Sequence, residues 1–398
     1  MKLRNLCWIA ALPVVSALCR AGETVVLKEG GLSVAMDAAF PRIIACRLPA
    51  GDVPGNPAAA IVVQLNGAPA PCKVVSTRKS ENTLVYQLSF PTERISLDLV
   101  VAALPDGIHM EPRNLEEAGA VKLKTLAFPD NPLLTISTKS PDAAIAACLA
   151  TNVNDQFGTT FRERISPVAS LKAGERDTGN YLFLSASGVA CGIASDNFTD
   201  IRRTEWKITE AEGVKTCAAG VPVWEFRKFD DEKPDLPAVH VFLTPDLNGD
   251  NKADWQDAAI VYRRTMPKPL GSDKARTTVG ENIAMNFASG AQQPFLKILD
   301  EIKRIHLATD GLGNQVIIKG FSSEGHDSAN TDYADHWNER AGGLKDLNVL
   351  LENAGKYNAR IGIHINATEA YPEAMRYKPE ILRKDANGNF KGGWPWPD

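Results

Sequence analysis

Residues 315–327 read Gln-Val-Ile-Ile-Lys-Gly-Phe-Ser-Ser-Glu-Gly-His-Asp, an apolar run that passes directly into polar residues. The uninterrupted branched residues at 316–318 predict a strand buried on both faces, which is typical of parallel sheets. Similar segments lie before and after this one, at 282–288 and 360–366. The stretches between them carry apolar residues three and four positions apart, as helices do. Strands that alternate with helices in this way predict parallel βα units.

The first predicted helix begins at Pro294, because proline is favoured in the first turn of a helix. The apolar faces are Phe295, Ile298, Leu299, Ile302 and Ile305 in this helix, and Leu344, Leu347, Leu350, Leu351, Ala354 and Tyr357 in the second. A (β/α)₈ barrel takes roughly 250 residues. We therefore expect residues 271–398 to form an incomplete, N-terminal part of such a TIM barrel, with the natural chain continuing beyond Asp398.

Residues 22–270 follow a different pattern, in which apolar and polar residues alternate over short segments. The alternating apolar residues are Leu84, Tyr86, Leu88 and Phe90 in one segment, and Ile95, Leu97 and Leu99 in the next. This period of two predicts half-buried strands, and many short strands predict an antiparallel β-sandwich. We expect only short helices here, at 141–149 and 254–264. The fold class is therefore multidomain, a β-sandwich followed by an α/β region.

The first 21 residues are predicted to be a secretory signal peptide. Lys2 and Arg4 precede an apolar run at 6–18, and small residues follow it, which is the pattern of export signals. The alternative is a membrane anchor, but the run is too short to span a bilayer comfortably. We therefore expect a protein that is secreted or lies at the cell surface or in the periplasm.

Composition and cysteine spacing exclude some classes of function. The formal net charge is −4, so a broad nucleic-acid-binding surface is not expected. After signal removal the cysteines are Cys46, Cys72, Cys148, Cys191 and Cys217. Their spacing matches no metal motif, and buried apolar use is the favoured interpretation, although one or two disulfides stay open.

Residues 246–257 read Asp-Leu-Asn-Gly-Asp-Asn-Lys-Ala-Asp-Trp-Gln-Asp and match the spacing of a twelve-residue calcium loop. The expected Ca²⁺ ligands are Asp246, Asn248, Asp250, the backbone carbonyl of Lys252, Asp254 and Asp257. Calcium takes six to eight hard oxygen ligands, which this spacing would wrap around one ion. The alternative is a solvated acidic turn that caps the following helix.

Polar residues follow the second and third predicted strands, where barrel enzymes place their chemistry. We expect Asp327 to be functional, whereas His364 is interpreted as a packed core histidine. Trp394 and Trp396 are two positions apart and would share one side of an extended segment. Aromatic faces beside Asp, His and Asn side chains suit a sugar. Glu369 alone does not indicate catalysis, since glycoside hydrolysis usually needs a pair of carboxylates.

Several segments together resemble the opening barrel segment of glycoside hydrolase family 101, the endo-α-N-acetylgalactosaminidases. They are Asn286-Phe287-Ala288, residues 308–313, Gly325-His326-Asp327-Ser328, His364-Ile365-Asn366-Ala367 and Gly393-Trp394-Pro395-Trp396. The calcium loop also resembles that of the family. The resemblance implies a galactose-mutarotase-like β-sandwich before the barrel. It also implies that Asp327, His326, Trp394 and Trp396 contact substrate.

The same resemblance implies a retaining hydrolase that releases galactose-β1,3-N-acetylgalactosamine from serine or threonine of mucin-type O-glycoproteins. The family's nucleophile and acid/base residue lie on later strands, so we assign no catalytic residue and expect the chain alone to be inactive. One alternative is a non-catalytic, calcium-dependent O-glycan-binding protein. Another is a structural or adhesive surface protein, which the single copy of the calcium loop disfavours.

Overall fold

The structure is a computed structural model and describes residues 17–18, 23–58, 62–151, 160–196, 203–266, 268–287, 290–327, 332, 336–366 and 369–392. The chain divides into two compact units, residues 1–266 and 267–398. The predicted signal peptide lies outside the described residues, except for the short strand β1 (Ala17–Leu18). In the part of the chain that is described, no helix is both long and apolar enough to cross a membrane.

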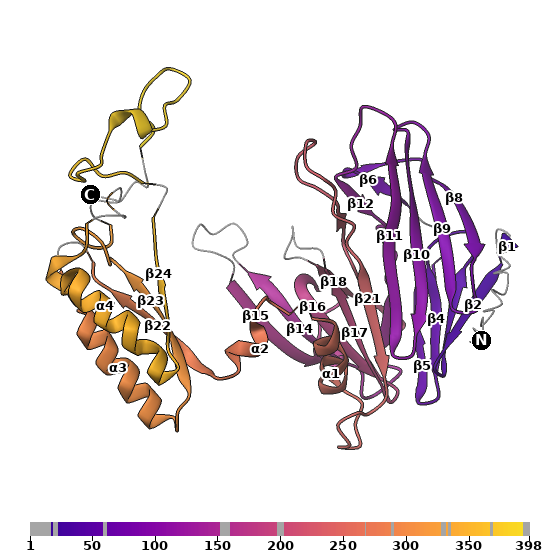
Figure 1. Ribbon diagram of the computed structural model, residues 1–398. Coiled ribbons are helices and arrows are strands. Elements are labelled where there is room, and N and C mark those ends of the chain that lie inside the picture. Colours follow the sequence, from indigo (N-terminus) through magenta and orange to yellow (C-terminus); the bar gives the residue numbers. More distant parts are fainter. Residues whose placement is uncertain are drawn as a thin grey trace, which may run out of the picture. The chain divides into compact units, whose positions relative to one another are not determined.

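The first unit consists almost entirely of antiparallel strands (Figure 1). Its largest sheet has thirteen strands in the order β1-β8-β9-β10-β11-β21-β17-β16-β18-β19-β13, with β14 between β15 and β16. The bounds are β8 (Lys73–Arg78), β9 (Thr83–Phe90), β10 (Ile95–Leu104), β11 (Gly107–Glu117), β13 (Leu134–Ser137), β14 (Ala144–Thr151), β15 (Thr160–Pro167), β16 (Arg176–Ala186), β17 (Val189–Ser195), β18 (Thr204–Ala211), β19 (Val214–Gly220) and β21 (Val239–Thr244).

Two four-stranded sheets complete the strands of this unit. One contains β2 (Thr24–Glu29), β3 (Leu32–Asp37), β4 (Ile43–Leu48) and β5 (Gly51–Pro54). The other contains β20 (Trp224–Glu225), β12 (Thr125–Ala127), β6 (Gln64–Leu65) and β7 (Ala68–Pro69). The short helical turn η1 (Val168–Ser170) follows β15, and helix α1 (Trp255–Thr265) ends the unit.

The alternating residues of β9 and β10 bury one face of the large sheet, as their period of two predicts. Leu84, Tyr86, Leu88 and Phe90 are fully buried. They share one core with apolar residues of the β2–β5 sheet, such as Leu27, Val34, Met36 and Ile43. The predicted β-sandwich is therefore confirmed.

The helix predicted at 141–149 is wrong, because residues 144–151 form strand β14. This strand pairs with β15 on one side and β16 on the other. Its two faces contribute to different clusters, Ile145 and Leu149 to the main core and Ala146 to a second one. A strand covered on both faces loses the alternation that identifies strands in sequence, and its alanines then suggest a helix.

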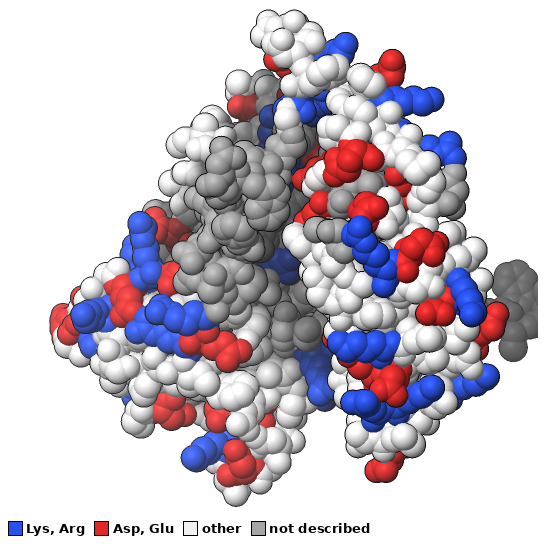
Figure 2. Space-filling model, turned by 90° about the vertical axis from the view of Figure 1, so that its left-hand side faces the viewer, with Lys and Arg blue, Asp and Glu red and all other residues white. Residues whose placement is uncertain are grey.

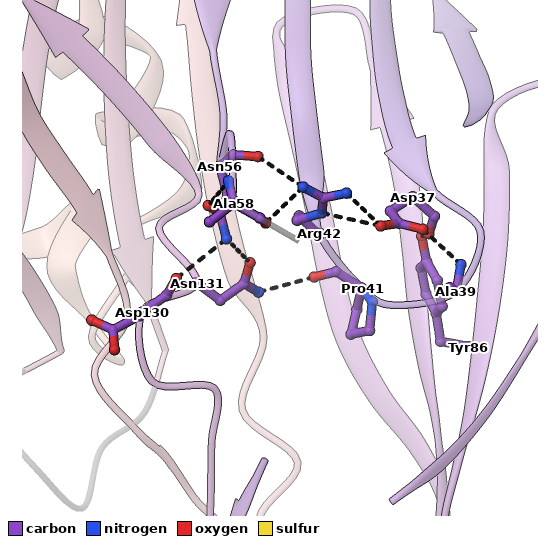
Figure 3. A network of polar contacts seen from close by, with 9 residues as sticks. All are labelled: Asp37, Ala39, Pro41, Arg42, Asn56, Ala58, Tyr86, Asp130 and Asn131. Carbon is purple, nitrogen blue, oxygen red and sulfur yellow. Dashed lines mark hydrogen bonds and ion pairs between the residues drawn. The ribbon is translucent and has the colours of Figure 1, made fainter. Parts of the chain in front are cut away.

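One partly buried ion pair fixes the turn between β3 and β4 (Figure 3). Arg42 donates to the Asp37 carboxylate from Nε at 3.1 Å and from Nη2 at 2.6 Å. Its Nη1 donates to the carbonyl oxygen of Ala58 at 2.6 Å. Asn56 lies beside this contact and donates to Asn131 Oδ1 at 2.9 Å. The guanidinium therefore joins segments that are distant in sequence.

The second unit is a three-stranded parallel sheet in the order β22-β23-β24. Its elements are α2 (Ser272–Ala275), β22 (Thr278–Met285), α3 (Phe295–Ala308), β23 (Gly313–Lys319), η2 (Glu339–Ala341), α4 (Gly343–Ala354), η3 (Gly355–Tyr357), β24 (Arg360–Ile363) and η4 (Pro379–Ile381). Apolar residues of both longer helices, including Ile298, Ile302, Leu347 and Leu350, form one core with Val316 and Ile318 of the central strand. The predicted βα units are confirmed.

Charged side chains of both signs lie on the surface of the described residues. On the face shown in Figure 2, lysines and arginines are interspersed with aspartates and glutamates. This mixture agrees with the small formal net charge of −4.

The turn after β23 requires glycine. Gly320 has a φ of +75°, a backbone conformation that other residues adopt at a steric cost. A Cβ atom at this position would lie 2.0 Å from the carbonyl oxygen of Asn286 and 2.5 Å from the backbone nitrogen of His326. The chain segments after β22 and β23 therefore touch at this point.

We expect Arg42→Ala to lower the free energy of unfolding by about 3 kcal/mol, because it leaves a carboxylate that is mostly shielded from water without its partner. The side chains of Arg42 and Asp37 are only 11% and 14% exposed. Arg47→Ala is the matched control, since the side chains of Arg47 and Asp52 are 73% and 64% exposed. The control should change stability by less than about 1 kcal/mol. Equal effects in urea unfolding would contradict the assignment.

We expect Gly320→Ala to weaken the sheet of the second unit by about 2 kcal/mol, through its positive φ and the contact with Asn286. Gly280→Ala is the control, because a Cβ there meets no atom within 4 Å. Hydrogen exchange of the β22, β23 and β24 amides measures the effect. Equal protection in the two variants would show that the turn does not need glycine.

Candidate functional site

Backbone hydrogen bonds align the carboxyl ends of the parallel strands. Asn286 donates its N–H to Lys319 O at 2.9 Å, and His326 donates to Asn286 O at 2.7 Å. His364 donates to Ile318 O at 3.0 Å. The residues that follow the three strands are therefore held at one edge of the sheet, where α/β barrels place their chemistry.

The side chain of Asn286 is fully buried and fixes the connection to α3. Its Nδ2 donates to Gln293 O at 2.9 Å, and its Oδ1 accepts from Gln293 N at 2.8 Å. The amide thus satisfies the backbone just before Pro294, which precedes the first turn of the helix. This residue supports the edge of the sheet.

Asp327 and His326 lie side by side at this edge. His326 Nε2 is 3.2 Å from Asp327 Oδ1, and the two side chains are 13% and 18% exposed. Asp327 has a φ of +58°, a left-handed conformation that aspartate tolerates better than most residues. The His326 ring also contacts the Phe287 ring, with a centroid separation of 5.8 Å. The predicted substrate-binding pair is therefore partly buried and oriented by an aromatic neighbour.

His364 differs from the packed core histidine that we expected. Strand β24 ends at Ile363, so His364 lies just beyond it and is half-buried. Its ring packs edge-on against His326, with centroids 5.0 Å apart. Partial burial, and then the positive charges of Lys319 and His326, lower the pKa of His364. A lowered pKa keeps the ring neutral at pH 7, so it can both donate and accept hydrogen bonds.

Sequence reasoning missed Tyr371, which is coupled to the same edge. Its hydroxyl donates to Glu369 Oε2 at 3.1 Å, and Asn366 Nδ2 donates to the same oxygen at 2.8 Å. Burial, then the hydrogen bond and charge of Glu369, and then the charge of Asp327 raise the pKa of Tyr371 to about 12. The spacing Glu369-Ala-Tyr371 after a strand end was the available signal.

We call His326, Asp327, His364, Glu369 and Tyr371 the strand-end group. It combines two carboxylates, two imidazoles and a phenol, all partly buried or half-buried. Such a set can accept and donate hydrogen bonds to several hydroxyl groups at once, which suits a carbohydrate. The predicted Trp394 and Trp396 lie outside the described residues.

The predicted calcium loop precedes α1 in the first unit. Asp246 accepts from Gly249 N at 2.7 Å and from Asn251 N at 2.8 Å. Asn248 Oδ1 accepts from Asp250 N, and Asp250 Oδ1 accepts from Lys252 N, both at 2.9 Å. These local hydrogen bonds fold the loop back on itself.

Asp257 closes the loop and is fully buried. Its Oδ1 accepts from Leu247 N at 2.7 Å and from Asn248 N at 3.1 Å. Its Oδ2 accepts from Asp254 N at 2.9 Å, which forms a capping box with the Asp254 side chain at the start of α1. Although burial acts to raise it, these backbone donors bring the pKa of Asp257 below its usual value. The helix-capping alternative is therefore realised.

The donor chemistry of the loop fits a hard cation, since its side chains offer carboxylate and amide oxygens. Within the described ranges, however, no three His, Cys, Asp or Glu side chains converge closely enough to hold a metal ion. The loop oxygens instead accept hydrogen bonds from loop amides. A bound calcium ion would coordinate oxygens that already accept these hydrogen bonds.

Comparison with known proteins gives a matching family for each of two segments of the chain. Residues 27–255 match the galactose mutarotase-like fold domain, and residues 256–398 match the family described as endo-alpha-N-acetylgalactosaminidase. The chain is 32% identical over 395 residues to a Renibacterium salmoninarum protein named "Putative endo-alpha-N-acetylgalactosaminidase". The match covers 94% of this chain and 25% of that protein, so the chain spans about a quarter of this relative.

Two solved structures are similar to the chain at low sequence identity. An alpha-galactosidase of glycoside hydrolase family 36 from Geobacillus stearothermophilus has a TM-score of 0.50 and 15% identity, over 93% of this chain and 60% of that one. An alpha-N-acetylgalactosaminidase from Bifidobacterium bifidum has a TM-score of 0.49 and 13% identity, over 92% of this chain and 62% of that one. The first likeness shows the fold alone.

The galactose mutarotase-like domain at residues 27–255, the match over residues 256–398 and the strand-end motifs agree with one another. Residues 27–255 therefore form a galactose mutarotase-like fold domain, and residues 256–398 belong to the endo-α-N-acetylgalactosaminidase family, glycoside hydrolase family 101.

Proposed function

We propose that this chain carries the sugar-binding side of a retaining endo-α-N-acetylgalactosaminidase. The substrate would be a mucin-type O-glycoprotein, from which galactose-β1,3-N-acetylgalactosamine is released whole from serine or threonine. The observation that supports this proposal is the position of Asp327 beside His326 at the carboxyl edge of the parallel sheet, with His364 packed against the same ring. Family membership supports the class of reaction.

Asp327 is the residue best suited to hold the sugar. Its Oδ1 faces His326 Nε2 at 3.2 Å, which fixes the carboxylate and leaves Oδ2 to accept from sugar hydroxyls. Hydrogen bonds to a charged acceptor are the stronger ones. The neutral His364 ring can donate to a neighbouring hydroxyl, and the Phe287 ring beside His326 offers an apolar surface for sugar C–H groups.

The catalytic pair is a separate matter. In a retaining mechanism one carboxylate attacks the anomeric carbon while a carboxylic acid protonates the departing oxygen. His326 Nε2 already lies 3.2 Å from Asp327 Oδ1, and Asn366 and Tyr371 both donate to Glu369 Oε2. We therefore propose that these two residues position sugar and that the 398 residues alone bind without hydrolysis.

A second candidate is a non-catalytic, calcium-dependent O-glycan-binding protein. The carboxylates that are already engaged in the strand-end group are compatible with it. Assays of any longer form of the protein distinguish the two functions, because only the hydrolase would cleave the glycan in such a form.

We also propose that the loop at 246–257 binds Ca²⁺ through Asp246, Asn248, Asp250, the Lys252 carbonyl and Asp257. Its twelve-residue spacing and its oxygen donors support this proposal. The ion would cross-link the loop to the start of α1. Calcium is abundant outside cells, which fits the proposed export of the chain to the cell surface, the periplasm or the medium.

Asp327→Asn should weaken binding of galactose-β1,3-N-acetylgalactosamine to the chain by roughly tenfold or more, because it removes a charged acceptor. Asparagine tolerates the same left-handed backbone. Asp310→Asn is the matched control, since Asp310 is exposed and also has a positive φ, of +52°. Isothermal titration calorimetry measures both. Equal affinity in wild type and Asp327→Asn would exclude Asp327 from the sugar site.

The chain alone should release no nitrophenol above the buffer rate from a nitrophenyl glycoside of the core disaccharide, because glycoside hydrolysis needs an available pair of carboxylates. The control is the same substrate with an active member of the family. Ordinary turnover by the 398 residues would disprove the proposed division between binding and catalysis.

Chelation should lower the thermal midpoint of the wild-type chain by about 5 °C relative to calcium-saturated protein, if the free ion is at about 100 times its Kd. Asp250→Asn keeps an oxygen for the Lys252 amide but removes a charge, so this variant should respond much less to chelator. Asp52→Asn, at an exposed position on β5, should respond as wild type does. A wild-type midpoint that chelator leaves unchanged would refute the calcium site.

A further inference from the structure

A pair of histidines lies at the seam where β11 meets β21, in the thirteen-stranded sheet of the first unit. His109 and His240 are directly opposite each other in this antiparallel pairing, so their side chains share one face. The two strands pair only over residues 107–110 and 239–242. This short seam joins the β8–β11 side of the sheet to the β17–β21 side.

The two rings approach each other through the same kind of nitrogen. His109 Nδ1 and His240 Nδ1 are 3.3 Å apart, and the ring centroids are 4.7 Å apart. Two Zn–N bonds of about 2.0–2.1 Å at a tetrahedral angle place their nitrogens about 3.3 Å apart. The observed separation is therefore already that of two imidazoles on one tetrahedral ion.

A carboxylate lies near the outer nitrogen of the His109 ring. His109 Nε2 is 3.6 Å from Glu111 Oε2. Arg113 holds this carboxylate, donating to the same oxygen from Nε at 2.9 Å and from Nη2 at 2.6 Å. A carboxylate at Nε2 favours the proton on that nitrogen and leaves the Nδ1 lone pair toward His240. Metal-bound histidines are commonly oriented in this way.

The cross-strand neighbours of the pair have small side chains. The residues directly opposite the two histidines on their other neighbouring strands are Ala102 on β10 and Ala194 on β17. The His109 side chain is 27% exposed, so water reaches the site. Phe242 stacks on His240, with ring planes 7° apart and centroids 6.2 Å apart, and limits the movement of that ring.

We propose that His109 and His240 bind a divalent transition-metal ion of the zinc class through their Nδ1 atoms, with water in the remaining positions. Imidazole nitrogens select zinc, nickel or copper over calcium, which takes oxygen ligands. The ion links β11 to β21 across the short seam, so it stabilises the sheet. This site is separate from the loop at 246–257 and from the strand-end group.

The test uses the tag-free 398-residue chain, freed of metal and then saturated with calcium so that the acidic loop is filled. Titration with ZnCl₂ should give one ion per chain, and Zn²⁺ should raise the thermal midpoint, whereas MgCl₂ should do neither. His109→Gln and His240→Gln should each abolish binding. Glu111→Gln keeps both ligands and should weaken binding by roughly tenfold or more through loss of the orienting carboxylate.

His364→Gln is the control, because His364 and His326 form a second ring pair, in the other unit. This variant should bind Zn²⁺ as wild type does. If His240→Gln unfolds the sheet, the His109→Gln and Glu111→Gln variants still decide the question. Unchanged Zn²⁺ affinity in His109→Gln, or loss of binding in His364→Gln alone, overturns the proposal.

Discussion

The contact between Gly320 and the carbonyl oxygen of Asn286 decides where the strand-end group lies. A Cβ at position 320 would be only 2.0 Å from that oxygen, so the chain after β23 approaches the chain after β22 as closely as backbone can. The Asn286 carbonyl then accepts from His326 N. This hydrogen bond places His326 and Asp327 at the edge, where the rings of Phe287 and His364 meet them. The polar site thus depends on one glycine and one buried amide.

The first unit follows a different principle. Its core is a continuous apolar layer shared by the sheets, and paired polar groups are local exceptions within it. Arg42 and Asp37 form one such exception, and the amides that surround Asp257 form another. A buried carboxylate is tolerated only when donors compensate for the lost water.

Patterns between neighbouring residues predicted the fold well. The alternation in β9 and β10 and the uninterrupted run in β23 each identified a strand correctly. The segment at 141–149 misled, because a strand covered on both faces has no alternation. The ion pair of Arg42 with Asp37 and its contact with Ala58 depend on where the chain returns in space. No local pattern in the sequence encodes such a return.

The candidate site was predictable only in part. Asp327 followed from the rule that barrel chemistry lies at strand ends, and His326 followed from the family resemblance. His364 was misjudged because the strand predicted to run to residue 366 ends at Ile363, which leaves the next side chain outside the core. Tyr371 was missed because its role depends on the charges of Glu369 and Asp327 around it. Electrostatic coupling of this kind appears only when positions in space are known.

The most direct test of the account is a crystal structure of this chain with galactose-β1,3-N-acetylgalactosamine bound. The account predicts that sugar hydroxyls lie within hydrogen-bonding distance of the Asp327 carboxylate, at the carboxyl edge of β22, β23 and β24. A disaccharide bound only on the β-sandwich, with no sugar at Asp327 under saturating conditions, would contradict it.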